Sequence, residues 1–162
     1  MMSAPRTWGF LPSVLDRLLD DDPARRHESA PRHGHSLQQL IQAVRRDLEH
    51  LLNTRQALLE DLPAAFPEAQ RSLLTYGLPD FTALSLQDPH DRVRLRRALE
   101  QAITLGEPRL LRVRVTLASP GQPDQVLRCR IEAFLRVEPA PEPVTFDALL
   151  RTNQEYVVQG AA

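Results

Sequence analysis

The chain of 162 residues has no lysine, one cysteine, few aromatic residues and no apolar run long enough to span a bilayer. A single cysteine excludes an intramolecular disulfide, and Cys129 falls at an inward position of an expected strand, where it acts as a small hydrophobe. All 20 basic residues are arginine, whose planar guanidinium suits carboxylates. The net charge of −1 provides no overall field that would attract nucleic acid or an anionic membrane.

Residues 1–35 are expected to form a partly disordered, mobile tail with a short amphipathic docking helix at residues 13–19. Its apolar face comprises Val14, Leu15, Leu18 and Leu19, and an acidic run ends it. This face either docks on a partner or folds back onto its own domain. The apolar stretch is too short and too interrupted for a signal peptide, so we expect a soluble cytoplasmic protein.

Residues 36–158 are expected to form a single α+β domain. Ser36 and Gln39 form a capping-box pattern that starts a helix at 36–53, and Asp88 starts another at 88–105. Further expected elements are a short helix at 68–76, strands at 109–118 and 125–138, and two shorter strands within 144–158, after prolines that interrupt pairing. This order predicts about three helices packed on one face of a four-stranded antiparallel sheet.

The tripeptide Glu107-Pro108-Arg109 lies between an expected helix and an expected strand. In the alternation of the expected strand, Glu107 and Arg109 fall on the same side as its apolar residues. Both should therefore lie at the edge of the buried face. Buried charges are costly unless they are paired, so each needs a partner, either the other residue or a group on another protein. The motif is therefore a candidate interaction site, and Arg109→Ala is expected to impair assembly while barely changing folding.

Four segments of the chain, taken in order, carry a family resemblance. They are residues 44–55 (VRRDLEHLLNTR), 72–80 (SLLTYGLPD), 107–110 (EPRL), and 130–133 (RIEA) continuing into 137–146 (VEPAPEPVTF). Together they resemble the TssE family, type VI secretion baseplate subunits akin to the phage baseplate wedge protein once labelled lysozyme-like.

The resemblance implies a structural subunit without cofactors or catalytic residues, located in the cytoplasm near the inner membrane. It implies contact with the TssF, TssG and TssK baseplate subunits and with the first ring of the TssB–TssC sheath. The Glu-Pro-Arg motif is implied to form an assembly interface, and the terminal sheet at 144–158 to accept a sheath strand. The candidate partner-binding residues are Glu107, Pro108, Arg109, Leu15, Leu18, Leu19, Val144, Phe146, Tyr156 and Val158.

Three other functions fit the sequence less well than this interpretation. A lysozyme-like enzyme needs two carboxylates across a cleft, one with a raised pKa, and Asp61, Glu68 and Glu107 lack such a context. The tail histidines (His27, His33, His35) are more often solvated than bound to a metal. The arginines at 92–97 lack interleaved aromatic residues, so they favour a solvated or protein-docking face over nucleic-acid binding.

Overall fold

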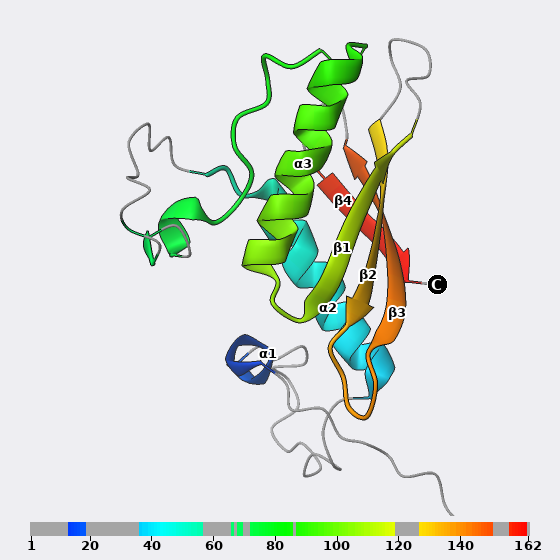
Figure 1. Cartoon of the computed structure of the whole chain (residues 1–162). Helices are drawn as coiled ribbons and strands as arrows, with labels where there is room; N and C mark the ends of the chain where they lie inside the picture. Colours follow the sequence, from blue (N-terminus) through cyan, green and yellow to red (C-terminus); the bar gives the residue numbers. More distant parts are fainter. Residues whose placement is uncertain are drawn as a thin grey trace, which may run out of the picture. The chain divides into compact units, whose positions relative to one another are not determined.

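The computed structural model describes residues 13–18, 36–56, 66, 68–69, 72–85, 87–118, 127–150 and 156–161. The chain divides into two compact units, residues 1–44 and 45–162, and helix α2 (Leu37–Asn53) begins in the first and ends in the second (Figure 1). The first unit also contains helix α1 (Val14–Leu18), whose first turn is stabilised by hydrogen bonds between Ser13 and Asp16.

The starts of the two long helices follow from their capping residues. The Ser36 N–H donates to Gln39 Oε1 at 2.8 Å and the Gln39 N–H donates to Ser36 Oγ at 3.3 Å, which confirms the capping box of α2. Helix α3 (Pro89–Gly106) begins after Asp88, whose carboxylate accepts from the His90 N–H at 2.8 Å. Both helices therefore start within a residue of the expected positions.

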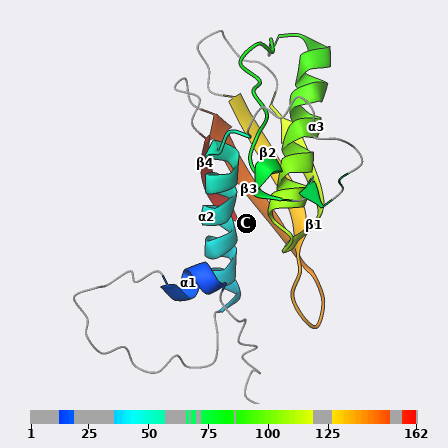
Figure 2. The same cartoon turned by 90° about the vertical axis from the view of Figure 1, so that its left-hand side faces the viewer.

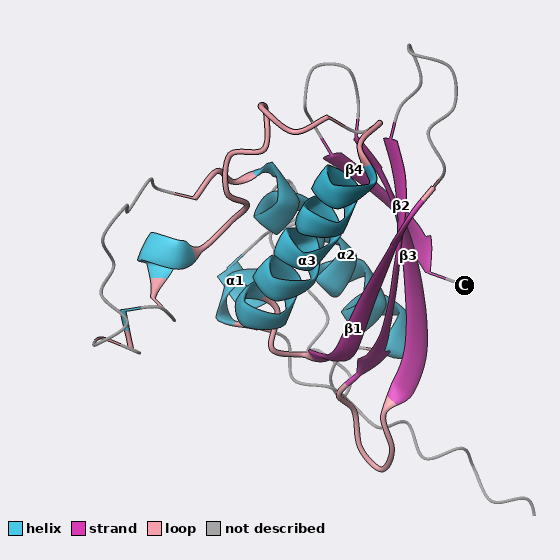
Figure 3. Ribbon diagram, turned by 45° about the horizontal axis from the view of Figure 1, so that its top comes forward, coloured by secondary structure: helices cyan, strands magenta, loops and turns pink. Residues whose placement is uncertain are grey.

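The second unit contains a four-stranded antiparallel sheet with the strand order β1-β2-β3-β4. The strands are β1 (Leu110–Leu117), β2 (Leu127–Leu135), β3 (Glu142–Leu150) and β4 (Tyr156–Ala161). Figures 1 and 2 show α3 and the part of α2 from Arg45 onward on one face of this sheet. Figure 3 shows helices and strands as separate layers, and the α+β class is thus confirmed.

The core of this unit lies between the sheet and these two helix segments. Every second residue of β2 is buried, which is the alternation expected of a strand with one solvated face. Cys129 is one of these inward residues, as expected. The fully buried side chains with the largest volumes in this unit are Tyr156, Phe146, Leu48, Leu51, Leu52, Leu78, Leu95, Leu99, Ile103, Ile131 and Leu135.

The helix expected at residues 68–76 is wrong. The described part of this segment contains 3₁₀ conformation at Ala69 and a 3₁₀ turn at Leu73–Thr75 but no α-helix. The turn follows Ser72, whose hydroxyl accepts from the Leu74 N–H. Leu73 is 88% exposed, so no apolar face is buried there to stabilise a helix. The expectation of about three helices on the sheet is corrected to two.

Two details of the sheet also differ from the expected pattern. The pairing of β1 with β2 shifts between Leu111 and Arg114, and Arg112 adopts a φ of 53° at this bulge. The bulge reverses the alternation, so Leu110 is buried while Leu111 and Val113 are only half-buried. Pro143, expected to interrupt pairing, lies within β3 opposite Phe134, at a place where β4 provides no neighbour.

Among the described residues, no helix combines the length and the apolar composition that crossing a membrane requires.

Candidate functional site

The turn between α3 and β1 holds the Glu107-Pro108-Arg109 motif. A side chain at Gly106 would place its Cβ 2.6 Å from Leu51, so glycine allows the end of α3 to lie against α2. The Glu107 N–H still donates to the Ile103 carbonyl at 2.9 Å, and Pro108 then turns the chain toward the sheet. This geometry places the Glu107 carboxylate in the interior, where the residue is only 3% exposed.

Glu107 and Arg109 are partners of each other. Glu107 Oε1 accepts from the Arg109 Nε at 2.7 Å and from the Arg109 backbone N–H at 3.1 Å, and Oε2 accepts from Nη2. These hydrogen bonds raise the pKa of Arg109, although burial alone would lower it. Asp47 also raises the pKa of Arg109. Of the two alternatives for pairing, the structure contains the intramolecular one.

Asp47 on α2 is a second carboxylate for the same arginine. Its Oδ2 accepts from Arg109 Nη2, and its Oδ1 accepts from Arg46 Nη2 at 3.1 Å. Asp47 and Arg109 are each about one-quarter exposed at the side chain, so the group reaches the surface. An arginine thus joins α2 to the α3–β1 turn, and replacing it would leave Glu107 buried without its partner. The expectation that Arg109→Ala barely changes folding is therefore revised.

The loop at residues 76–80 lies beside these carboxylates. Gly77 adopts a φ of 103°, and a Cβ there would lie 2.5 Å from the Thr54 carbonyl oxygen. Leu78 then pairs with the end of α2 through a 2.8 Å hydrogen bond from its N–H to Thr54 O. Burial and the charges of Asp47 and Glu107 raise the pKa of the Tyr76 phenol. The loop is therefore a structured turn with a glycine at positive φ.

The outer edge of β4 is hydrogen-bonded to side chains of α2. Asn53 donates to the Tyr156 carbonyl at 2.8 Å and accepts from the Tyr156 N–H at 2.7 Å, as a neighbouring strand would. One turn earlier Glu49 accepts from the Val158 N–H at 3.3 Å, and Arg45 donates to the Val158 carbonyl at 3.2 Å. Residues spaced by four on α2 thus bond the outward backbone groups of Tyr156 and Val158.

The outer edge of β1 is bonded to α3 in the same manner. Glu100 accepts from the Val115 N–H at 3.0 Å, and Arg92 donates to the carbonyls of Leu117 at 3.2 Å and Ala118 at 2.8 Å. We call an edge closed where its outward backbone groups already have such partners.

The first part of β3 has no such partner along one edge among the described residues. Strand β3 pairs with β2 along residues 142–150, but β4 pairs only with residues 146–150. Backbone N–H and carbonyl groups of successive strand residues point to alternate sides of the strand. Those of Tyr156 and Val158 point toward α2, so those of Val157 and Gln159 point toward β3, where their partners are Leu149 and Asp147. In β3 the backbone groups of Thr145 therefore point to the same side as those of Asp147, where β4 provides no partner. We call residues 142–145 the open edge of β3.

The residues predicted from the sequence to bind partners lie in three places. Glu107, Pro108 and Arg109 share the α3–β1 turn, whereas the side chains of Val144, Phe146, Tyr156 and Val158 are buried in the core, so only their backbone can reach a partner. In α1, Val14 is 74% and Leu18 is 76% exposed. Leu19, the side chain of Leu15 and the tail histidines lie outside the described residues.

Sequence reasoning missed Asp47, Glu49, Asn53 and Glu100 as site residues. Glu49 and Asn53 could have been found from their spacing, because Arg45, Glu49 and Asn53 are four residues apart and lie along one side of α2. Nothing in the sequence alone pairs Asp47 with Arg109, because the two are 62 positions apart.

Comparison with known proteins gives one family match. A sequence model of the family described as baseplate wedge protein gp25 matches residues 38–140, more than half of the chain. Among curated proteins, none matches the chain. A chain in the solved structure titled "The baseplate complex from the type VI secretion system" is similar at 26% sequence identity with a TM-score of 0.46, and the match covers 71% of this chain and 97% of that chain.

Proposed function

Because the chain belongs to the baseplate wedge protein gp25 family, we propose that it is a structural subunit of a type VI secretion baseplate and that it assembles there in the cytoplasm. The family match over residues 38–140 is the observation that carries this conclusion. The ordered motifs at 44–55, 72–80, 107–110 and 130–146 support the type VI form of the family. We propose TssF, TssG and TssK as its wedge partners.

The α3–β1 turn is the proposed contact with the wedge. Pro108 is exposed, and Arg109 and Asp47 each retain some exposed surface around the buried Glu107. The carboxylates hold Arg109 in place before a partner arrives, so its conformational entropy is already lost, which favours binding. The exposed leucine of α1, Leu18, is the proposed second contact, within the docking helix at 13–19.

The open edge of β3 is the proposed attachment point for a strand of the TssB–TssC sheath. An added strand gains backbone hydrogen bonds only where a strand edge lacks partners. The bonded outward groups of Val115 and Leu117 in β1 and of Tyr156 and Val158 in β4 do not meet that condition. Residues 142–145 have no such partners among the described residues. The proposed sheath contact at residues 142–145 thus overlaps the expected region of 144–158 at residues 144 and 145.

The same geometry supports a structural function over a lysozyme-like activity. A glycoside hydrolase needs a protonated carboxyl group next to its substrate. Both oxygens of Glu107 instead accept hydrogen bonds from Arg109, and the residue is nearly inaccessible. We propose that the chain is not an enzyme, and hydrolysis of peptidoglycan by the purified protein would contradict this.

Co-purification tests the proposed function directly. The full chain should associate with a TssF–TssG–TssK complex from the same baseplate, and deletion of its gene should stop sheath assembly and secretion. Complementation with the unaltered chain should restore both. Failure of the chain to associate with any wedge or sheath subunit would overturn the proposal.

A further inference from the structure

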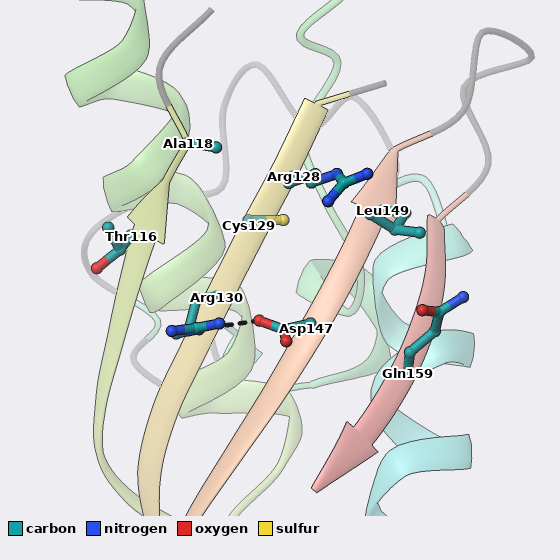
Figure 4. A pocket seen from close by; sticks show the side chains of 8 residues that line it. All are labelled: Thr116, Ala118, Arg128, Cys129, Arg130, Asp147, Leu149 and Gln159. Atoms are coloured by element: carbon teal, nitrogen blue, oxygen red, sulfur yellow. Dashed lines mark hydrogen bonds and ion pairs between the residues drawn. The ribbon is translucent and has the colours of Figure 1, made fainter. Parts of the chain in front are cut away.

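The outer face of the sheet, on the side away from α3, carries a pattern of charge that the proposed function does not use. Its charged side chains are Arg112, Arg114, Arg128, Arg130, Glu132 and Asp147. Four arginines against two carboxylates give this face a local excess of two positive charges, although the whole chain has a net charge of −1. In the second unit, α3 lies behind these strands in Figure 4, and all six charged residues are exposed.

Three of these four arginines have no carboxylate partner among the described residues. Only Arg130 does, through a 3.0 Å ion pair with Asp147 that Figure 4 shows as a dashed line. Arg128 lies opposite the apolar Leu149. Arg114 lies opposite Glu132 in the register without an ion pair between them.

The remaining arginine, Arg112, lies beside an exposed aromatic ring. The bulge in β1 places its guanidinium carbon 5.8 Å from the centroid of the Phe134 ring. Phe134 is 38% exposed, so part of its ring offers apolar surface on this face. Unpaired guanidinium groups thus alternate with exposed apolar surface on this face.

Two hollows lie on this face of the sheet. One has a volume of about 390 Å³, and its wall includes Arg128, Asp147, Leu149 and Gln159, whose side chains Figure 4 shows on three neighbouring strands. The other has a volume of about 650 Å³ and lies toward the other end of the same strands. Its polar and apolar walls are formed by Arg112, Arg114, Glu132, Phe134, Pro143 and Thr145.

We propose that this outer face binds an acidic segment of another baseplate subunit, with carboxylates at Arg114 and Arg128 and apolar side chains against Phe134 and Leu149. The inference rests on the proposed function. Guanidinium groups hold carboxylates through paired hydrogen bonds, so arginines without acidic partners complement an acidic chain. Nucleic acid fits less well, because Glu132 and Asp147 would repel phosphates between the arginines and the whole chain is not basic.

Charge reversal on the intact protein tests the proposal. The variant Arg114→Glu/Arg128→Glu should bind an immobilised TssF–TssG–TssK complex on the order of tenfold or more weakly, and the loss should be smallest at high salt. The matched control, Arg94→Glu/Arg97→Glu, changes two exposed arginines of α3 and should bind like the unaltered chain. Thermal unfolding establishes that both variants are folded.

A photoreactive residue in place of Thr116, which is exposed and lines the first hollow, gives an independent readout. The cross-linked peptide should carry more acidic than basic residues. If the unaltered chain binds and the reversed variant binds equally well, the proposal falls while the proposed function stands. If the unaltered chain binds no wedge complex, the proposed function fails. Binding of a labelled DNA duplex that only the reversed variant loses, with wedge binding intact, would make the face a nucleic-acid surface and overturn the proposal.

Discussion

At the scale of single residues, Arg109 connects two carboxylates on different elements, one of them buried. Arg109→Met keeps the aliphatic stem and removes the donors, so Glu107 would remain buried without its partner. We expect a loss of about 2 kcal/mol in the free energy of unfolding, below the value for a fully buried pair because Arg109 is partly exposed. Urea unfolding measures it. The control is Arg130→Met, which breaks an exposed ion pair and should change stability much less.

Equal losses for the two methionine variants would show that the Glu107–Arg109 pair contributes no more than a surface ion pair. Binding of Arg109→Met to the wedge complex should then be measured at a temperature where the variant is fully folded, so that a loss of stability is not mistaken for a loss of contact.

The hydroxyl of Tyr156 is buried without a hydrogen-bond partner among the described residues, while its ring contacts Phe81 edge-on at 6.3 Å between centroids. Tyr156→Phe removes the unsatisfied group and keeps the ring, so stability should be unchanged or higher by up to about 1 kcal/mol. Tyr156→Leu loses the ring and should be destabilising by comparison. Thermal unfolding of both separates the two contributions, and a clear loss in Tyr156→Phe would indicate a hydroxyl partner.

Cys129 gives the protein a dependence on alkaline pH. Burial raises the pKa of its thiol from 9.0 to about 12. Above pH 9 the unfolded chain releases this proton while the folded chain keeps it, so stability should fall as pH rises toward 12, by at most about 1.4 kcal/mol per pH unit. Cys129→Ala should be less stable at about pH 8 but show a smaller decrease between about pH 8 and about pH 10. Parallel slopes would contradict this assignment.

At the scale of elements, the two long helices and the four strands could be predicted because local signals and buried faces agree. Ser36 and Asp88 cap helices whose leucines are buried, and Cys129 to Leu135 alternate along β2. The helix expected at 68–76 failed where these signals conflict, since its leucines have no surface to pack against. The bulge at Arg112 has no local signal, because it depends on where β2 places its partners.

The contact between α2 and β4 makes a further element-scale prediction. Asn53→Ala would leave the N–H and carbonyl of Tyr156 without the partner they have in the folded protein. We expect a loss of about 2 kcal/mol in stability and faster hydrogen exchange at the Tyr156 amide, both measurable by NMR under native conditions. His50→Ala changes an exposed residue of the same helix and should affect neither. An unchanged Tyr156 amide in Asn53→Ala would refute the role of this side chain.

At the scale of the whole molecule, sequence reasoning located one part of the candidate site and not its surroundings. Glu107 and Arg109 stood out because charges beside a strand need partners, and they proved to be partners. Asp47 could not be assigned, because only the packing of α2 against the α3–β1 turn brings it to Arg109. Likewise, which strand edge is open depends on the lengths of β3 and β4 and on helix side chains that no local pattern relates to them.

The proposed attachment of the sheath gives the whole-molecule prediction. Thr145→Pro removes an N–H that points away from β2, so the sheet should form while association with TssB–TssC weakens by on the order of tenfold. Thr145→Val keeps the N–H and should associate normally. In the free protein the Thr145 amide should exchange rapidly. A Thr145→Pro chain that no longer folds, together with a protected Thr145 amide, would show that this group is used inside the sheet.

The side chains that bond to the outer edges of β1 and β4 have a consequence for the free protein before it joins an assembly. Unpaired strand edges let copies of one protein pair with each other and aggregate, and natural sheets are protected against this in several ways. Here Asn53, Glu49 and Glu100 bond to backbone N–H groups through which two copies could otherwise pair. We therefore expect self-association of free chains through these groups to be disfavoured, while the proposed attachment at 142–145 would let a sheath strand add at one place and in one direction.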